Sequence, residues 1–143
     1  MRKTSVDISS YVSGLSDVKI AFVLEADNDS TTKAGFYIDD VEVIADGEQI
    51  FFDDMDGNRT GGTGNWTHWA VYGSDEWENG IPSNTNPVYG GIPHSGTKCW
   101  ATDLDNTYEI GSYQWLVSPS LNMSGKTSVI LNFYNWYVVE YRS

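Results

Sequence analysis

The stretch "GFYIDDVEVIADGEQIFFDDMDG", residues 35–57, decides the fold expected for this chain. Aromatic and branched residues fill 35–44 and 48–55, and both segments are typical of β-strands. The intervening "ADGE" contains an Asp-Gly pair, a strong signal for a tight β-hairpin. Each segment also carries two adjacent aspartates among apolar residues, where charge is costly. The stretch therefore predicts a hairpin and raises the question of what four carboxylates do there.

A period of two residues continues through much of the chain. In "DVKIAFVLEA" (17–26), Val18, Ile20, Phe22 and Leu24 alternate with other residues, as in a strand with one buried face. Later segments with strand character are 97–104, 113–121 and 127–141.

Regular structure is not expected throughout. The region 57–96 is rich in Gly, Asn and Pro and predicts long loops around one short strand near "HWAVYG". The segment 7–15 could form a single helical turn. Many short strands without helices predict an all-β, jelly-roll-like antiparallel β-sandwich.

The composition narrows the possible functions. With 143 residues, 40% of them hydrophobic, the chain is long enough for one domain with a real core. Its net charge of −12 argues against nucleic acid or an anionic membrane as a partner, because both attract basic surfaces. The excess of carboxylates suits a hard cation such as calcium, although adaptation to high salt would also produce it.

The chain is expected to be either a cytoplasmic protein or a fragment of a longer exported one, and the second, with an extracellular or cell-surface location, is preferred. No segment is apolar for long enough to insert into a membrane, and "MRKTSVDISSYV" lacks the apolar run of a signal peptide. A composition rich in Asn, Ser, Thr, Tyr and Trp, with four Asn-x-Ser/Thr triplets, favours export. The single cysteine, Cys99, is interpreted as a small buried hydrophobic residue.

Two parts of the chain resemble one family of modules. The first part is similar to the closing third of the MAM-like jelly-roll modules of secreted peptidases such as bacillopeptidase F and immune inhibitor A, and it reads "VDISSYVSGLSDVKIAFVLEADNDSTTKAGFYIDDVEV". The choice-of-anchor J (cleaved adhesin) domains end in a similar way. The opening of the same module resembles "FFDDMDG", "WTHWAVYGSDEWENGIP", "SGTKCWATDLDNTYEIGSYQWLVSPSLNMSG" and "VILNFYNWYVVE". The resemblance implies a jelly-roll sandwich.

The order of these parts is reversed, because 1–45 resembles the end of the module and 46–143 its beginning. The chain is then a window across two tandem repeats, a single permuted domain at 1–143, or one of several copies that complete one another by exchanging strands. The permuted domain is preferred, because the first and last strands of a jelly roll usually pair.

The resemblance also implies a structural calcium ion. In similar carbohydrate-binding jelly rolls, an aspartate of a "YIDDV"-like last strand helps to hold calcium, and the matching residue here is Asp39. The candidate metal ligands are Asp39, Asp53, Asp54, Asp40 and Asp56.

Strand alternation would place Asp39 on the same face as Val41 and Val43, with Asp40 on the opposite face. One aspartate of each pair would then point inward or to a sheet edge, where bare carboxylates repel and a cation relieves the repulsion. The alternative is that the aspartates cap turns, accept hydrogen bonds from backbone amides and discourage edge pairing.

We expect a protein that is not an enzyme, because no zinc-protease helix, nucleophile elbow or phosphate-binding glycine loop occurs. The acids beside Trp77 (Asp75, Glu76 and Glu78) are interpreted as solvated loop residues.

Aromatic residues in the loop-rich region could stack on sugar rings. The candidates are Trp66, Trp69, Trp77, Tyr72 and Tyr89. They support a carbohydrate-binding accessory module of a secreted hydrolase, with glycans as partners. We prefer an adhesive or structural module that contacts other copies of itself or adjacent repeats, because the reversed order leaves sheet edges to be filled.

Overall fold

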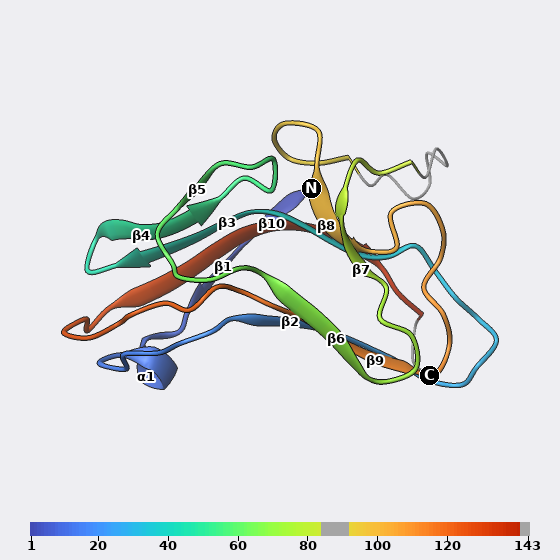
Figure 1. Cartoon of the computed structure of the whole chain (residues 1–143), viewed down its shortest axis with the longest axis horizontal. Coiled ribbons are helices and arrows are strands. Elements are labelled where there is room, and N and C mark those ends of the chain that lie inside the picture. Colours follow the sequence, from blue (N-terminus) through green and yellow to red (C-terminus); the bar gives the residue numbers. More distant parts are fainter. Residues whose placement is uncertain (84–91, 141–143) are drawn as a thin grey trace.

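The structure, a computed structural model, describes residues 1–83 and 92–140. Within these residues lie one short helix, α1 (Ser9–Val12), and ten strands: β1 (Arg2–Asp7), β2 (Ala21–Ala26), β3 (Gly35–Ala45), β4 (Glu48–Asp53), β5 (Arg59–Thr60), β6 (Thr67–Tyr72), β7 (Trp77–Gly80), β8 (Cys99–Thr102), β9 (Ser112–Val117) and β10 (Val129–Val138). The strands form two antiparallel layers (Figure 1), which confirms the all-β, jelly-roll-like sandwich. None of the described helices is long and apolar enough to span a membrane.

The two sheets differ in size. The long sheet has seven strands and runs β1-β10-β3-β4-β5, with β8 on β3 and β7 on β8. The short sheet has three strands in the order β2-β9-β6. Residues 1–45 and the rest of the chain each contribute strands to both sheets. The interpretation as a permuted domain stays a prediction.

The hairpin expected from "ADGE" is confirmed, since β3 pairs with β4. Asp46 and Gly47 both have positive φ, 50° and 81°, as a type I′ turn requires. The Asp46 carboxylate accepts hydrogen bonds from the Ser128 amide (2.8 Å) and the Thr127 hydroxyl (3.0 Å). The turn is thereby tied to the start of β10.

Strand alternation breaks at Asp40. Asp39 pairs with Tyr134 of β10 and Glu42 with Asn132, so β3 has one residue more than β10 in this interval. Asp40 has a φ of 47°, as expected for a β-bulge. The predicted sharing of one face by Asp39, Val41 and Val43 is therefore wrong: the extra residue puts Ile38 with the two valines in the core between the sheets.

The core lies between the two sheets. Its largest fully buried side chains include Phe51, Ile38, Leu116 and Met123. A smaller cluster around Tyr37, fully buried Cys99 and Ala101 forms a separate apolar group. The interpretation of Cys99 as a buried hydrophobic residue is confirmed, and burial raises the pKa of its thiol to about 12.

Several elements differ from the sequence-based expectation. The strand expected at 17–26 begins only at Ala21, and that expected at 127–141 spans Val129–Val138. The strand near "HWAVYG" is confirmed as β6, whereas β1, β5 and β7 were not expected.

Candidate functional site

The first aspartate pair lies at a break in the edge of β3. That edge pairs with β4 through Val41–Ala45 and with β8 through Tyr37 and Ile38, so Asp39 and Asp40 fall between two partner strands. The loop before β8 covers the break. Ser95 donates its amide to Asp39 Oδ2 (3.0 Å) and its hydroxyl to Asp40 Oδ1 (2.7 Å). The pair therefore anchors this loop to the sheet.

Burial controls the charge at this break. Asp39 is fully buried, and its burial raises the pKa of the carboxyl to about 6, although the amides of Ser95 and Asp40 oppose the shift. His94 Nδ1 lies 2.6 Å from Asp40 Oδ2, and the His94 ring stacks on Tyr134 with 3.4 Å between centroids. A histidine, a serine and backbone amides thus surround the two carboxylates.

The second pair and Asp56 organise the turn after β4. Asp53 accepts the Met55 amide (2.8 Å) and the Trp66 indole N–H (2.9 Å). Asp54 accepts the amides of Asp56 and Asn58. Burial opposes ionisation of Asp54, but these hydrogen bonds and the Asn58 side chain lower the pKa of its carboxyl.

Asp56 reaches from that turn to the segment before β8. Its carboxylate accepts hydrogen bonds from the Thr97 amide (3.1 Å) and the Lys98 amide (3.2 Å). A Cβ at Gly96 would collide with the same carboxylate, so this close approach requires glycine. Asp39, Asp40 and Asp56 together fix the stretch 94–98 from two sides.

The five candidate calcium ligands do not gather around one point. Among the described residues, three or more acidic, histidine or cysteine side chains bring ligand atoms within 4.8 Å of one another only at Glu78, Asp103 and Asp105. The hydrogen bonds of the five aspartates correspond to the alternative interpretation, in which they cap turns and hold loops. Calcium binding stays a prediction.

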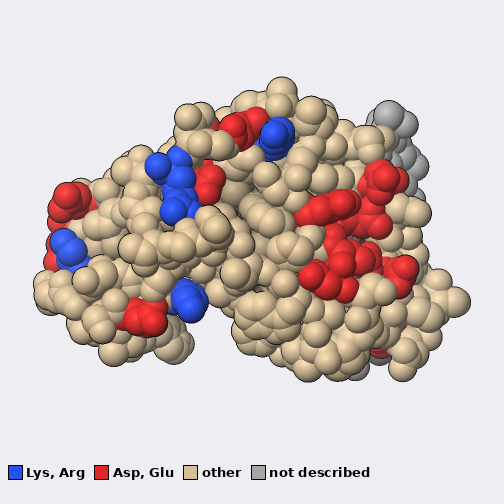
Figure 2. Space-filling model, in the orientation of Figure 1, with Lys and Arg blue, Asp and Glu red and all other residues tan. Residues whose placement is uncertain are grey.

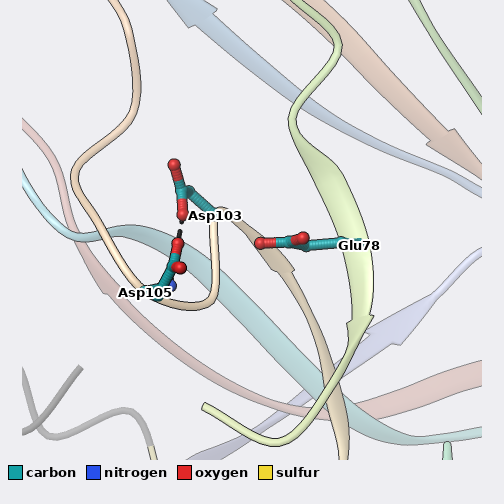
Figure 3. Close-up of side chains that lie close together, drawn as sticks. All are labelled: Glu78, Asp103 and Asp105. Atoms are coloured by element: carbon teal, nitrogen blue, oxygen red, sulfur yellow. Dashed lines mark hydrogen bonds between the residues drawn. The ribbon is translucent and has the colours of Figure 1, made fainter. Parts of the chain in front are cut away.

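The cluster of Glu78, Asp103 and Asp105 joins β7 to the loop after β8 (Figure 3). Glu78 Oε1 accepts the Leu104 amide (2.7 Å), and Asp105 donates its amide to Asp103 Oδ1 (3.1 Å). Burial, together with a side-chain hydrogen bond to Asp105, raises the pKa of Asp103 to about 6.

This cluster belongs to a larger acidic patch. Figure 2 shows acidic side chains gathered over β7 and the loop that follows β8, apart from the basic residues. Burial raises the pKa of the neighbouring Glu76 to about 7, and the charges of Asp103 and Glu109 add to the effect. The sequence interpretation of Asp75, Glu76 and Glu78 as solvated loop residues did not connect them with Asp103 and Asp105, because only the unexpected β7–β8 pairing brings the two segments together.

The aromatic candidates separate into core and surface residues. Trp77 is 2% exposed and packs edge-on against Phe36, so it is a core residue and not a surface one. Trp66 packs against Phe22 and Phe51 while its indole bonds to Asp53. Tyr89 lies outside the described residues.

Trp69 and Tyr72 are exposed, at 44% and 48%, on the outer face of the short sheet. Trp69 stacks on Trp115 of β9 with 6.0 Å between centroids and 12° between planes. Tyr113 contacts both Trp115 and Tyr72. We call these four residues the aromatic face. Trp115 and Tyr113 were missed, because alternation in "YQWLV" indicates a strand but not which face stays uncovered.

A groove of about 650 Å³ runs along β2, and we call it the β2 groove. Residues 23–28 form one side, while Phe36 and Tyr137 of the long sheet form the other, together with Val139 just after β10. Three carboxylates also line it: Glu25, Asp27 and Glu140. Within the described residues β2 pairs only with β9, so the edge of β2 beside this groove is unpaired. The groove exists because a three-stranded sheet cannot cover a seven-stranded one.

Comparisons with known proteins do not assign the chain to a family: no family model, no curated protein and no solved structure matches it.

Proposed function

We propose that this chain is a non-catalytic adhesive or structural module that holds an extended protein segment along β2. The observation that carries the proposal is the unpaired edge of β2 beside the β2 groove. An extended segment added to a sheet edge gains main-chain hydrogen bonds, and its alternate side chains enter whatever pocket lies beside the edge. The extracellular setting inferred from the composition suits such a role.

The lining of the β2 groove defines the partner chemistry. Val23, Phe36 and Tyr137 offer apolar and aromatic surface, and Tyr137 is 59% exposed. The carboxylates of Glu25, Asp27 and Glu140 favour basic residues near the ends of the bound segment. The fitting partner is therefore an extended strand with alternating apolar side chains and at least one flanking lysine or arginine.

A labelled peptide of alternating Val and Thr with a lysine at each end tests this. We expect fluorescence anisotropy to report binding at about 10–100 μM, and a matched peptide with a central proline not to bind, because proline cannot donate to the ladder. Val23→Lys, at a groove residue that is 40% exposed, should weaken binding at least about tenfold. Equal binding of both peptides, or no effect of Val23→Lys, refutes the proposal.

A second candidate function, carbohydrate binding, is favoured by the aromatic face. The exposed Trp69, stacked on the half-buried Trp115, resembles a platform on which sugar rings can lie. Binding of the protein to insoluble cellulose, chitin and xylan would be measured by depletion. Trp69→Ala should reduce binding to the bound polysaccharide about tenfold. Tyr11→Ala, at an aromatic residue that is 79% exposed elsewhere, is the matched control.

Calcium remains part of the proposal as a stabilising ion. Carboxylate oxygens are the ligands that calcium prefers, and the chain offers them at the turn after β4 and at Glu78, Asp103 and Asp105. Melting with and without a chelator tests it, as described below.

A further inference from the structure

We propose that the segment held along β2 is β2 of a second copy of this chain, in an antiparallel pair centred on Phe22. This inference rests on the function proposed above and names its partner. Its basis is the sequence "KIAFVLE" (19–25), whose charges and apolar positions are symmetric about Phe22. A twofold contact requires such a surface, because each residue of one copy must fit the symmetry-related residue of the other.

The pairing follows directly from that symmetry. With Phe22 on the twofold axis, Lys19 lies opposite Glu25 of the second copy, and Ile20 lies opposite Leu24 of that copy. Ala21 then lies opposite Val23 of the second copy. Opposite charges meet twice in the pair, and no charge between 19 and 25 is left facing an apolar residue. Facing opposite charges stabilise antiparallel pairs, whereas like charges destabilise them.

The monomer presents this strand in the required form. Lys19, Ala21, Val23 and Glu25 are exposed, whereas Phe22 and Leu24 are buried. The chain before β2 continues along β9, because Ser118 donates its amide to the Ile20 carbonyl (2.8 Å) and Val18 bridges to Leu121. The outward row is therefore continuous from 19 to 25.

The β2 groove gives room for the part of the second strand that lies opposite residues 23–25. Paired strands lie about 4.8 Å apart, so β2 of the second copy would occupy the space beside residues 23–26. Ile20 of that copy, opposite Leu24, would point toward the interior side of the sheet, where Phe36 and Tyr137 line the groove. The pair joins two short sheets into one continuous sheet.

One neighbouring register competes with this one. An axis through Val23 would place Lys19 opposite Asp27 of the second copy and leave Glu25 facing Ala21. Only the axis through Phe22 pairs Lys19 with Glu25. Substitutions at 25 and 27 therefore distinguish the two registers.

Sedimentation equilibrium over a range of concentrations tests the proposal. We expect wild type to dimerise, and Lys19→Glu or Glu25→Lys to weaken the dimer about tenfold, since each places two like-charge pairs across the axis. An equimolar mixture of the two variants should dimerise as tightly as wild type, because the charges are again opposite in the mixed pair. The double variant should also recover wild-type affinity. In this register Asp27 lies opposite Asp17 of the second copy, so Asp27→Lys should not weaken the dimer.

The matched control is Lys98→Glu, which makes the same change in net charge at an exposed position away from β2. The proposal is overturned if the wild type is still a monomer at about 1 mM. It is also overturned if the two single variants and their mixture have the same dimerisation constant. An effect of Asp27→Lys instead of Glu25→Lys also overturns it. If the protein does not dimerise but the Val-Thr peptide still binds, the β2 edge does accept an added strand, and only its assignment to a second copy of this chain is wrong. If the peptide fails as well, the proposed function fails with it.

Discussion

Replacing Asp53 with asparagine separates the two roles considered for the aspartate pairs. Asp53 is 8% exposed, and its two oxygens accept N–H groups from Met55 and Trp66. Asparagine keeps the shape but has one oxygen, so its NH₂ group must face one of these donors. An unsatisfied buried donor and a lost charge-assisted hydrogen bond together cost about 2 kcal/mol.

That cost converts into a melting shift large enough to measure. An unfolding entropy of about 2.1 cal/mol/K per residue gives about 0.3 kcal/mol/K for 143 residues, so 2 kcal/mol corresponds to about 7 °C. The measurement is thermal and urea unfolding in the presence of a chelator. Asp54→Asn is the matched control. Both of its backbone partners, the amides of Asp56 and Asn58, donate to the same oxygen, which asparagine retains, and they lie nearer to solvent. We therefore expect this variant to lose less than about 1 kcal/mol of unfolding free energy.

A double-mutant cycle locates the effect at the indole. Trp66→Phe removes the donor to Asp53 Oδ2, so Asp53→Asn and Trp66→Phe combined should cost about 1 kcal/mol less than the sum of the two. Equal losses for Asp53→Asn and Asp54→Asn in chelator would refute the reasoning. A loss that occurs only with calcium present would assign Asp53 to the metal instead.

Three further outcomes follow from other sites. Burial raises the folded-state pKa of Asp39 from 3.8 to about 6, so the folded state binds this proton more tightly than the unfolded state does. The contribution of Asp39 to stability in chelator should therefore fall by about 2 kcal/mol from about pH 4 to about pH 7, once solvent screening is allowed for. In urea titrations Asp39→Asn should remove this part of the pH dependence and leave the part due to Glu76 and Asp103. If calcium stabilises the chain, its melting temperature should be several degrees higher in about 1 mM calcium than in chelator. Asp103→Asn and Asp54→Asn locate the site, because the variant that abolishes this difference carries a ligand. The absence of any difference in wild type would refute calcium binding. Gly61→Ala should lower the free energy of unfolding in urea by about 3 kcal/mol, because φ is 80° and the new Cβ meets the Ile50 carbonyl. Gly47→Ala is the control: its Cβ has open space around it, so it should cost only about 1 kcal/mol. Equal losses would contradict the packing argument.

Local sequence signals predicted the hairpin because its turn chemistry is contained in four residues. Asp46 and Gly47 adopt the positive φ that their pattern indicates. The face of Asp39 could not be predicted in the same way. One inserted residue, Asp40, inverts the alternation, and its position depends on the pairing with β10, which is remote in sequence.

Elements without an apolar face were the hardest to predict. β1 is exposed at most positions and has no alternating pattern, yet it pairs with all of Arg2–Asp7 against β10. β7 has only four residues. The acidic cluster and the β2 groove depend on such pairings and on the unequal size of the sheets, so neither is visible in any single segment of the sequence.

The position of β10 between β1 and β3 has a consequence for how the chain folds. Thr4 and Asn135, joined by a hydrogen bond of 2.8 Å, are 131 positions apart. The long sheet therefore cannot close until β10, more than 120 positions after β1, has been synthesised, and its contact order is correspondingly high. Domains dominated by such remote pairings fold in milliseconds to seconds. Until β10 is synthesised, the edges of β1 and β3 that pair with it are unpaired, and the nascent chain is then most prone to aggregation.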